Sequence, residues 1–262
     1  MNLRRERILD PYVRAELRLA LRARHLGLLL LGVAIAVVDA VSTPRLPVFA
    51  LDFLRSSLRL ESMADLILVN DYLGLYMIVL FAGAFELMRV YVGPAEAREL
   101  DLYLAKPIGR AHFIAARSAP ALLATLVVGA GISIANAITL QLWLGDVALV
   151  PILAAGVLIT AFVLVLLAAL NLAYLWLREV EHAVLLAFGF AIAPLLSTSV
   201  LIYRPDLFAG RELGLFSAFP ASLLWHGGVS MLTALLALAG ALVFAAVLVG
   251  VAAARLNRRP DL

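Results

Sequence analysis

The stretch 151–177, PILAAGVLITAFVLVLLAALNLAYLWL, contains no charged residue and decides the fold class. At a rise of about 1.5 Å per residue, a helix over this stretch is about 40 Å long, which exceeds the roughly 30 Å of hydrocarbon in a bilayer. We therefore predict that residues 151–177 cross a membrane as a helix that is tilted or extends past the hydrocarbon.

Five further apolar stretches are candidates for the same role. They are residues 26–41, 66–88, 119–143, 183–203 and 229–254. The composition agrees, because 64% of the residues are hydrophobic and 15% are charged, against averages of about 45–50% and about 25% in soluble domains. The sequence predicts an all-α membrane protein with six transmembrane helices in a single domain, 1–262. Pro194 lies inside the fifth stretch, where neighbouring helices are expected to accommodate it.

The distribution of basic residues predicts the orientation of the chain. Segments 1–25, 89–118, 178–182 and 255–262 hold 16 of the 21 Lys and Arg residues. The alternate connections, 42–65, 144–150 and 204–228, hold the other five. Because cytoplasmic loops carry the excess of Lys and Arg, both termini are expected in the cytoplasm. A cleavable signal peptide is the competing interpretation of the first stretch, but its charged lead is long and includes acidic residues.

The N-terminal segment 1–25 is predicted to hold an amphipathic helix at about 11–25, with Asp10 as a candidate N-cap. Arg14, Arg18 and Arg22 form one stripe of this helix. A basic amphipathic helix of this kind lies on the inner membrane surface among anionic headgroups. We expect an elbow helix that either anchors the orientation or also contacts a partner protein.

Two of the outer connections also contain apolar segments. The spacing of Leu51, Leu54 and Leu58 predicts a short helix that lies flat at the outer interface. Residues 213–225, LGLFSAFPASLLW, are apolar but are interrupted by Pro220. Each half is too short to cross the bilayer, so we expect a re-entrant or interfacial segment before the sixth span.

The cytoplasmic loop 89–118 has the pattern of a short helix held between two spans. Gly93-Pro94 predicts a break after the second span, and a new helix is expected at about 95–105, where acidic residues suit its first turn. Lys106-Pro107 is expected to end this helix, because the residue before a proline is biased away from helical geometry. Such a helix can serve as a rigid lever or simply close the loop.

Within this loop, residues 99–117, ELDLYLAKPIGRAHFIAAR, resemble the cytoplasmic loop of type-2 exporter-like ATP-binding-cassette (ABC) permeases. In that family an acidic, leucine-rich helix precedes a turn of the form (A/S)-x-P-(I/V)-(S/G)-R. The turn is matched by Ala105, Pro107, Ile108, Gly109 and Arg110. Arg117 occupies the usual basic position of the following helix, and the six-span topology with cytoplasmic ends is also similar to that family.

The resemblance implies that two such permease subunits, identical or homologous, form a transport path. Two separate ATPase subunits would dock beneath the loop, holding ATP and Mg²⁺, and membrane lipids and an extracytoplasmic accessory protein are further partners that it allows. It places the chain in the cytoplasmic (inner) membrane of a prokaryote, as a non-catalytic exporter subunit. The coupling residues it implies are Glu96, Glu99, Leu100, Tyr103, Leu104, Lys106, Pro107 and Arg110.

The residues themselves agree that ATP is not hydrolysed on this chain. A P-loop needs a lysine after a glycine-rich turn, and the single lysine, Lys106, stands between Ala105 and Pro107. The chain also has no cysteine, which excludes disulfides, cysteine-ligated metals and thiol catalysis. We expect no cofactor or metal on this chain, no catalytic residues, and no nucleic-acid partner.

Two carboxylates fall inside the predicted spans near the outer interface. Asp39 lies toward the end of the first span and Asp71 toward the start of the second. At that depth a charge costs little, so solvated or locally hydrogen-bonded side chains are expected. The functional alternative is a polar outer mouth for the substrate path.

Three further polar residues lie deeper in the spans or near the inner end. Glu86 and Arg89 share a helical face, and an ion pair is expected in preference to a role in transmitting motion. Asn136 and Asn171 are expected to hydrogen-bond between helices, with substrate contact as the alternative.

Two other functions are left open by the sequence. An ion-coupled transporter or channel subunit would use Asp39, Asp71 and Glu86, and its activity would follow a proton or sodium gradient without ATP. An intramembrane hydrolase would use His226 with Ser222, although no HExxH or GxSxG motif accompanies them.

Overall fold

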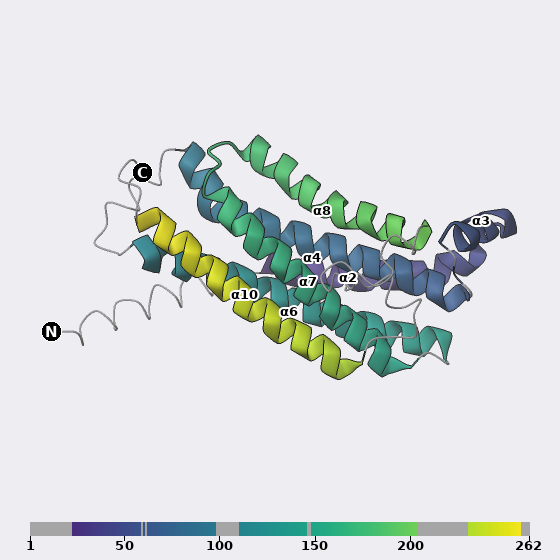
Figure 1. The fold of residues 1–262 in the computed structure, drawn as a ribbon. Coiled ribbons are helices and arrows are strands. Elements are labelled where there is room, and N and C mark those ends of the chain that lie inside the picture. Colours follow the sequence, from purple (N-terminus) through teal and green to yellow (C-terminus); the bar gives the residue numbers. More distant parts are fainter. Residues whose placement is uncertain are drawn as a thin grey trace.

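The computed structural model describes residues 23–58, 60, 62–97, 110–145, 148–203 and 230–257, and within these ranges the chain is all helical (Figure 1). The elements are α2 (Ala23–Ser42), the short 3₁₀ turn η1 (Thr43–Arg45), α3 (Val48–Leu58), α4 (Met63–Glu96), α6 (Arg110–Leu144), α7 (Leu149–Tyr174), α8 (Val180–Tyr203) and α10 (Met231–Asn257). The predicted all-α fold class is confirmed.

Five of these helices are long and apolar enough to cross a membrane. They cover Gly27–Arg45, Met63–Glu96, Phe113–Trp143, Leu149–Tyr174 and Met231–Arg255. The chain is therefore a multi-pass membrane protein. Helix α8 coincides with the predicted fifth span, but the apolar part of it whose side chains are described, Val180–Leu196, is shorter than the other five.

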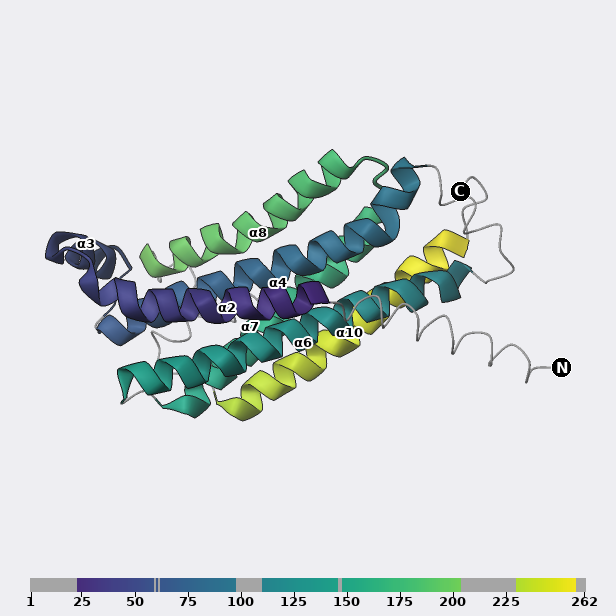
Figure 2. The same cartoon turned by 180° about the vertical axis from the view of Figure 1, so that it is seen from behind.

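Helices α4, α6 and α7 form the centre of the bundle. Helix α7 is the most buried of the five spans, and α10 packs along α7 and α6 (Figure 1). On the opposite side α2 lies along α6 and α4 (Figure 2), while α8 packs mainly on α4. The outer faces of α2, α8 and α10 expose large apolar side chains, which is the pattern expected for helices that face lipid.

The long helices run back and forth between the two ends of the bundle (Figure 1). At the α3 end lie α3, the start of α4 and the junction between α6 and α7. At the opposite end, here the loop end, lie the end of α4, the start of α6 and the end of α10, so residues 98–109 connect α4 to α6 there. Five candidate spans are found among the described residues, so the six-span topology stays a prediction.

Small residues allow α6 and α7 to approach closely. A Cβ atom added at Gly129 of α6 would lie 2.6 Å from the side chain of Thr160, and one added at Gly156 of α7 would lie 2.5 Å from that of Ser133. The two hydroxyl groups donate within their own helices, Ser133 to the Gly129 carbonyl at 2.7 Å and Thr160 to the Gly156 carbonyl at 2.9 Å. The helices therefore meet through two reciprocal small-x-x-x-small seams.

The short helix predicted from Leu51, Leu54 and Leu58 is present as α3, and α4 begins shortly after it with a capping box. The Ser62 hydroxyl accepts from the Asp65 backbone N–H at 3.0 Å, and the Asp65 carboxylate accepts from the Ser62 N–H at 3.0 Å. Together these contacts satisfy donors that the first turn of a helix leaves free. They fix the start of α4 three residues before the predicted span.

The predicted break at Gly93-Pro94 is wrong. Helix α4 continues through Pro94 to Glu96, so Glu96 ends this helix and does not begin another. Several predictions lie outside the described residues. These are the elbow helix up to residue 22, the coupling residues Glu99, Leu100, Tyr103, Leu104, Lys106 and Pro107, and the outer segment 213–225 with Ser222 and His226.

Candidate functional site

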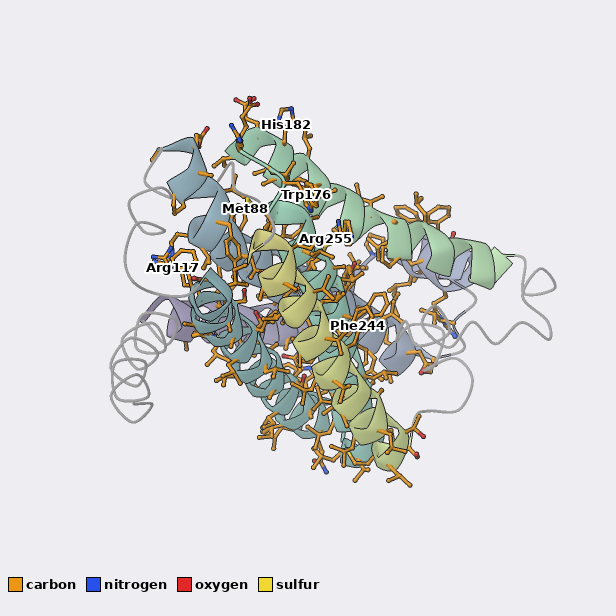
Figure 3. The ribbon with its side chains drawn as sticks, turned by 60° about the vertical axis from the view of Figure 1, so that its left-hand side comes forward. Met88, Arg117, Trp176, His182, Phe244 and Arg255 are labelled. Atoms are coloured by element: carbon orange, nitrogen blue, oxygen red, sulfur yellow. The ribbon has the colours of Figure 1, made fainter. Side chains whose placement is uncertain are left out.

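Arg117 joins α6 to α4 at the point where Pro94 interrupts the hydrogen bonding of α4. Proline has no N–H, so Pro94 leaves the carbonyl of Val90 without its helical partner. The Arg117 guanidinium donates to this carbonyl at 3.1 Å. The same guanidinium lies over the ring of Phe113, with its central carbon 4.9 Å from the ring centroid. Arg117 therefore explains why α4 continues through Pro94, and Figure 3 places it at the loop end.

A second proline is accommodated in the same way. Pro194 in α8 leaves the carbonyl of Phe190 free, and the Tyr76 hydroxyl of α4 lies 3.3 Å from that oxygen and 3.1 Å from the carbonyl oxygen of Ala191. Tyr76 is fully buried. As predicted for Pro194, a neighbouring helix supplies the missing hydrogen bond.

A buried polar network links the three central helices just inside the loop end. The Tyr91 hydroxyl of α4 forms a short hydrogen bond with Ser118 of α6, and the Ser118 hydroxyl donates to the Asn171 side-chain oxygen of α7 at 3.0 Å. All three side chains are almost fully buried. The interhelical role predicted for Asn171 is confirmed, and its amide nitrogen has no hydrogen-bond partner in the described part of the chain.

Two charge contacts complete the loop end. Glu86 and Arg89 form the predicted i, i+3 ion pair, with 3.5 Å between the carboxylate oxygen and the guanidinium nitrogen. At the same end, the Arg255 guanidinium of α10 lies 5.9 Å from the ring centroid of Trp176, beyond the end of α7 (Figure 3). Each basic side chain therefore has a partner that fits its charge.

The α3 end holds a different kind of cluster. Ile35 of α2 lies against Gly74 of α4, 3.3 Å from the position of an added Cβ. One turn further toward the α3 end, these antiparallel helices bring the Asp39 and Asp71 carboxyl groups within hydrogen-bonding range of each other. Asp71 is only 1% exposed, so of the two predicted environments, solvated or locally hydrogen-bonded, the solvated one does not hold for this residue.

Asn136 lies at a similar depth on α6. Ile132, one turn before it, fills the space at Gly32 of α2, 2.8 Å from the position of an added Cβ. Asn136 therefore sits on the face of α6 that packs against α2. It is 3% exposed, and its side-chain oxygen has no hydrogen-bond partner among the described residues. The side-chain oxygen therefore does not form the interhelical hydrogen bond predicted for Asn136 within the described residues.

The predicted coupling residues are only partly described. Glu96 is exposed at the end of α4, and Arg110 is the first residue of α6. Both therefore lie at the loop end, on the two helices that the 98–109 segment connects.

Sequence reasoning missed Tyr91 and Ser118, as well as the contact of Arg117 with α4. Their signal was weak, because a tyrosine and a serine near the end of a span are common at a membrane interface. Only the spatial register shows that they meet. In the parts of the chain that the structure describes, no three His, Asp or Glu side chains gather as metal ligands.

No protein-family model matches the chain, and no curated protein matches it.

Proposed function

We propose that this chain is the membrane-spanning permease subunit of an ATP-driven ABC transporter, acting as an exporter in the inner membrane of a prokaryote. Two copies, or one copy with a homologous chain, would form the path. Two separate ATPase subunits would supply the energy from ATP and Mg²⁺. The proposal rests on the resemblance of residues 99–117 to the loop of such permeases and on the geometry of the two helices that flank this segment.

The observation that carries the proposal is the way α4 and α6 are joined at the loop end. These helices have 34 and 35 residues, or about 51 and 52 Å, so each is longer than the hydrocarbon core. Near their loop ends they are connected by the Arg117–Val90 and Tyr91–Ser118 hydrogen bonds. A force on the 98–109 segment therefore acts on both helices together.

The proposed mechanism is mechanical. When ATP brings the two ATPase subunits together, they push the segment between α4 and α6. The hydrogen bonds of Ser118 with Tyr91 and Asn171 carry this displacement into α7, the most buried helix. The central helices then tilt, and access to the path changes from one side of the membrane to the other.

Because the chain has no cysteine, a single introduced cysteine can test whether the loop between α4 and α6 is the docking surface for the ATPase. A single Leu104→Cys variant carries the only thiol of the chain, so a thiol-reactive photo-crosslinker attached there labels whatever touches the loop in native membranes. We expect a crosslinked subunit that binds an ATP analogue. The matched control is Phe49→Cys on α3, at the opposite end and exposed, which should not crosslink to that subunit. Labelling of an ATP-binding subunit from position 49 and not from 104 would overturn the proposal.

The competing class is an ion-coupled transporter or channel subunit that uses the intramembrane carboxylates. The two classes differ in their energy source. In inverted vesicles, an ATP-driven subunit remains active after an uncoupler collapses the ion gradients, provided that ATP is supplied. Activity that is lost with the gradients and unaffected by ATP would favour the ion-coupled class.

A further inference from the structure

Several buried hydrogen-bond acceptors toward the α3 end have no donor. Both oxygens of Asp71, one oxygen of Asp39 and the side-chain oxygen of Asn136 are buried and have no hydrogen-bond partner in the described part of the chain. A buried acceptor without a donor is costly, and a buried charge without a counter-charge costs far more. The geometry therefore calls for a positively charged ligand.

The helices around Asp71 supply no such charge. Helix α7 has no charged residue, and the basic residues of α6 are confined to its loop end. Within α4, Tyr72 donates to the Ile152 carbonyl at 2.9 Å, and Asp65 belongs to the capping box. At the α3 end the described cations are Arg45, which is exposed, and Arg55, which lies on α3. Of the other titratable groups, Glu86, Arg89 and Tyr91 of α4, Tyr174 of α7, and Glu181 and His182 of α8 lie toward the loop end, and the Tyr76 hydroxyl contacts α8.

We propose that Asp39 and Asp71 form an exchangeable proton-binding site. One proton is held on Asp71, where it forms a hydrogen bond to the Asp39 carboxylate. Asp39 is only partly buried and is contacted by the exposed side chain of Asn70, so it is the point of entry from the α3 end. Uptake forms one O–H bond on a carboxylate oxygen, and release returns the proton to water.

A proton fits the cluster better than a multivalent metal. Two carboxyl groups in contact can form one hydrogen bond when a single proton lies between them. With that proton on Asp71, the fully buried group is neutral. Multivalent metals require more oxygen or nitrogen ligands than meet here, since no third acidic side chain or histidine joins the pair within the described ranges. The proposal does not rest on ATP-driven transport, because it concerns the isolated chain.

Infrared difference spectroscopy on the purified full chain in lipid nanodiscs tests the site. Between acidic and alkaline buffer, the wild-type chain should show the carbonyl stretch of a buried carboxylic acid, and this band should move to lower frequency in D₂O. Asp71→Asn should remove the band, and Asp39→Asn should change its frequency. The matched control, Asp52→Asn on the exposed face of α3, should leave the band as in the wild type.

Three results would overturn the proposal. The band could be missing from the wild-type chain, it could persist in Asp71→Asn, or it could fail to respond to D₂O, which would identify a permanently protonated structural pair. A fourth arm replaces Na⁺ by a bulky organic cation at constant pH. Loss of the band only when Na⁺ is present would identify a sodium site instead, whereas an unchanged band supports the proton.

Discussion

The two ends of the bundle differ in whether their buried polar groups have hydrogen-bond partners. At the loop end Arg117 donates to the carbonyl that Pro94 leaves free, and Ser118 bonds to both Tyr91 and Asn171. At the α3 end Asp71 and Asn136 are equally buried, but their acceptor oxygens meet no donor. Paired groups hold helices in register, whereas unpaired acceptors favour a ligand. This difference is the reason for proposing a mechanical role for the loop end and a binding role for the α3 end.

The largest effect should come from removing Arg117. Arg117→Leu leaves the Val90 carbonyl unpaired and removes the cation–π contact with Phe113, so we expect a loss of about 3 kcal/mol in the free energy of unfolding. The measurement is unfolding by SDS in mixed micelles, followed by circular dichroism.

A second substitution makes this prediction specific. Pro94→Ala restores a backbone N–H that can donate to Val90 within α4, so in the Arg117→Leu background it should recover about 1 kcal/mol. An equal loss with and without Pro94→Ala would contradict the assigned role of the guanidinium. Arg255→Leu is the matched control, because the Arg255 guanidinium lies over the ring of an exposed tryptophan, Trp176. This variant should lower the free energy of unfolding by about 0.5 kcal/mol.

Asn171→Leu should have the next largest effect. It removes the acceptor of Ser118 and deprives α7 of its polar contact with α6, at an expected loss of about 2 kcal/mol in unfolding free energy. In the proposed transporter assembly the same variant should lower transport per ATP hydrolysed, because the proposed displacement would no longer reach α7. Unchanged coupling with lowered stability would restrict Asn171 to packing.

Tyr76→Phe should have a smaller effect, about 1 kcal/mol, because it removes the hydroxyl that contacts the Phe190 carbonyl, left free by Pro194, and the neighbouring Ala191 carbonyl. The loss should shrink when Pro194→Ala is also present. A double-mutant cycle on SDS unfolding measures this coupling, and two strictly additive losses would show that the hydroxyl does not replace the missing bond.

The smallest effect on stability is expected at the α3 end. Asp71→Asn keeps the shape of the side chain and removes a titratable group that has no donor, so the free energy of unfolding at neutral pH should change by less than about 0.5 kcal/mol. A loss as large as that of Arg117→Leu would show that Asp71 is paired structurally and would erase the contrast between the two ends.

The sequence predicted the helices well and their polar partners poorly. Length and hydropathy located α2, α4, α6, α7 and α10, because the thickness of the bilayer sets a minimum length for each apolar helix that crosses it. The break at Pro94 was wrong, since local rules ignore a guanidinium supplied by another helix. Asp71 lies toward the α3 end of α4, but position along a helix does not say whether a side chain faces solvent or the neighbouring α2. Asn171 was recognised as an interhelical residue, although only the fold identifies Ser118 as its partner.

The central claim is that this chain transmits the energy of a separate ATPase, and ATP hydrolysis by the purified assembly tests it most directly. The tagged chain should co-purify with an ATPase from its native membranes, and the chain stripped of that partner should neither bind nor hydrolyse ATP. The Leu104→Glu variant should lose the partner, while Leu54→Glu on α3 should retain it. Nucleotide hydrolysis by the isolated chain, or retention of the ATPase by Leu104→Glu with loss in Leu54→Glu, would contradict the account.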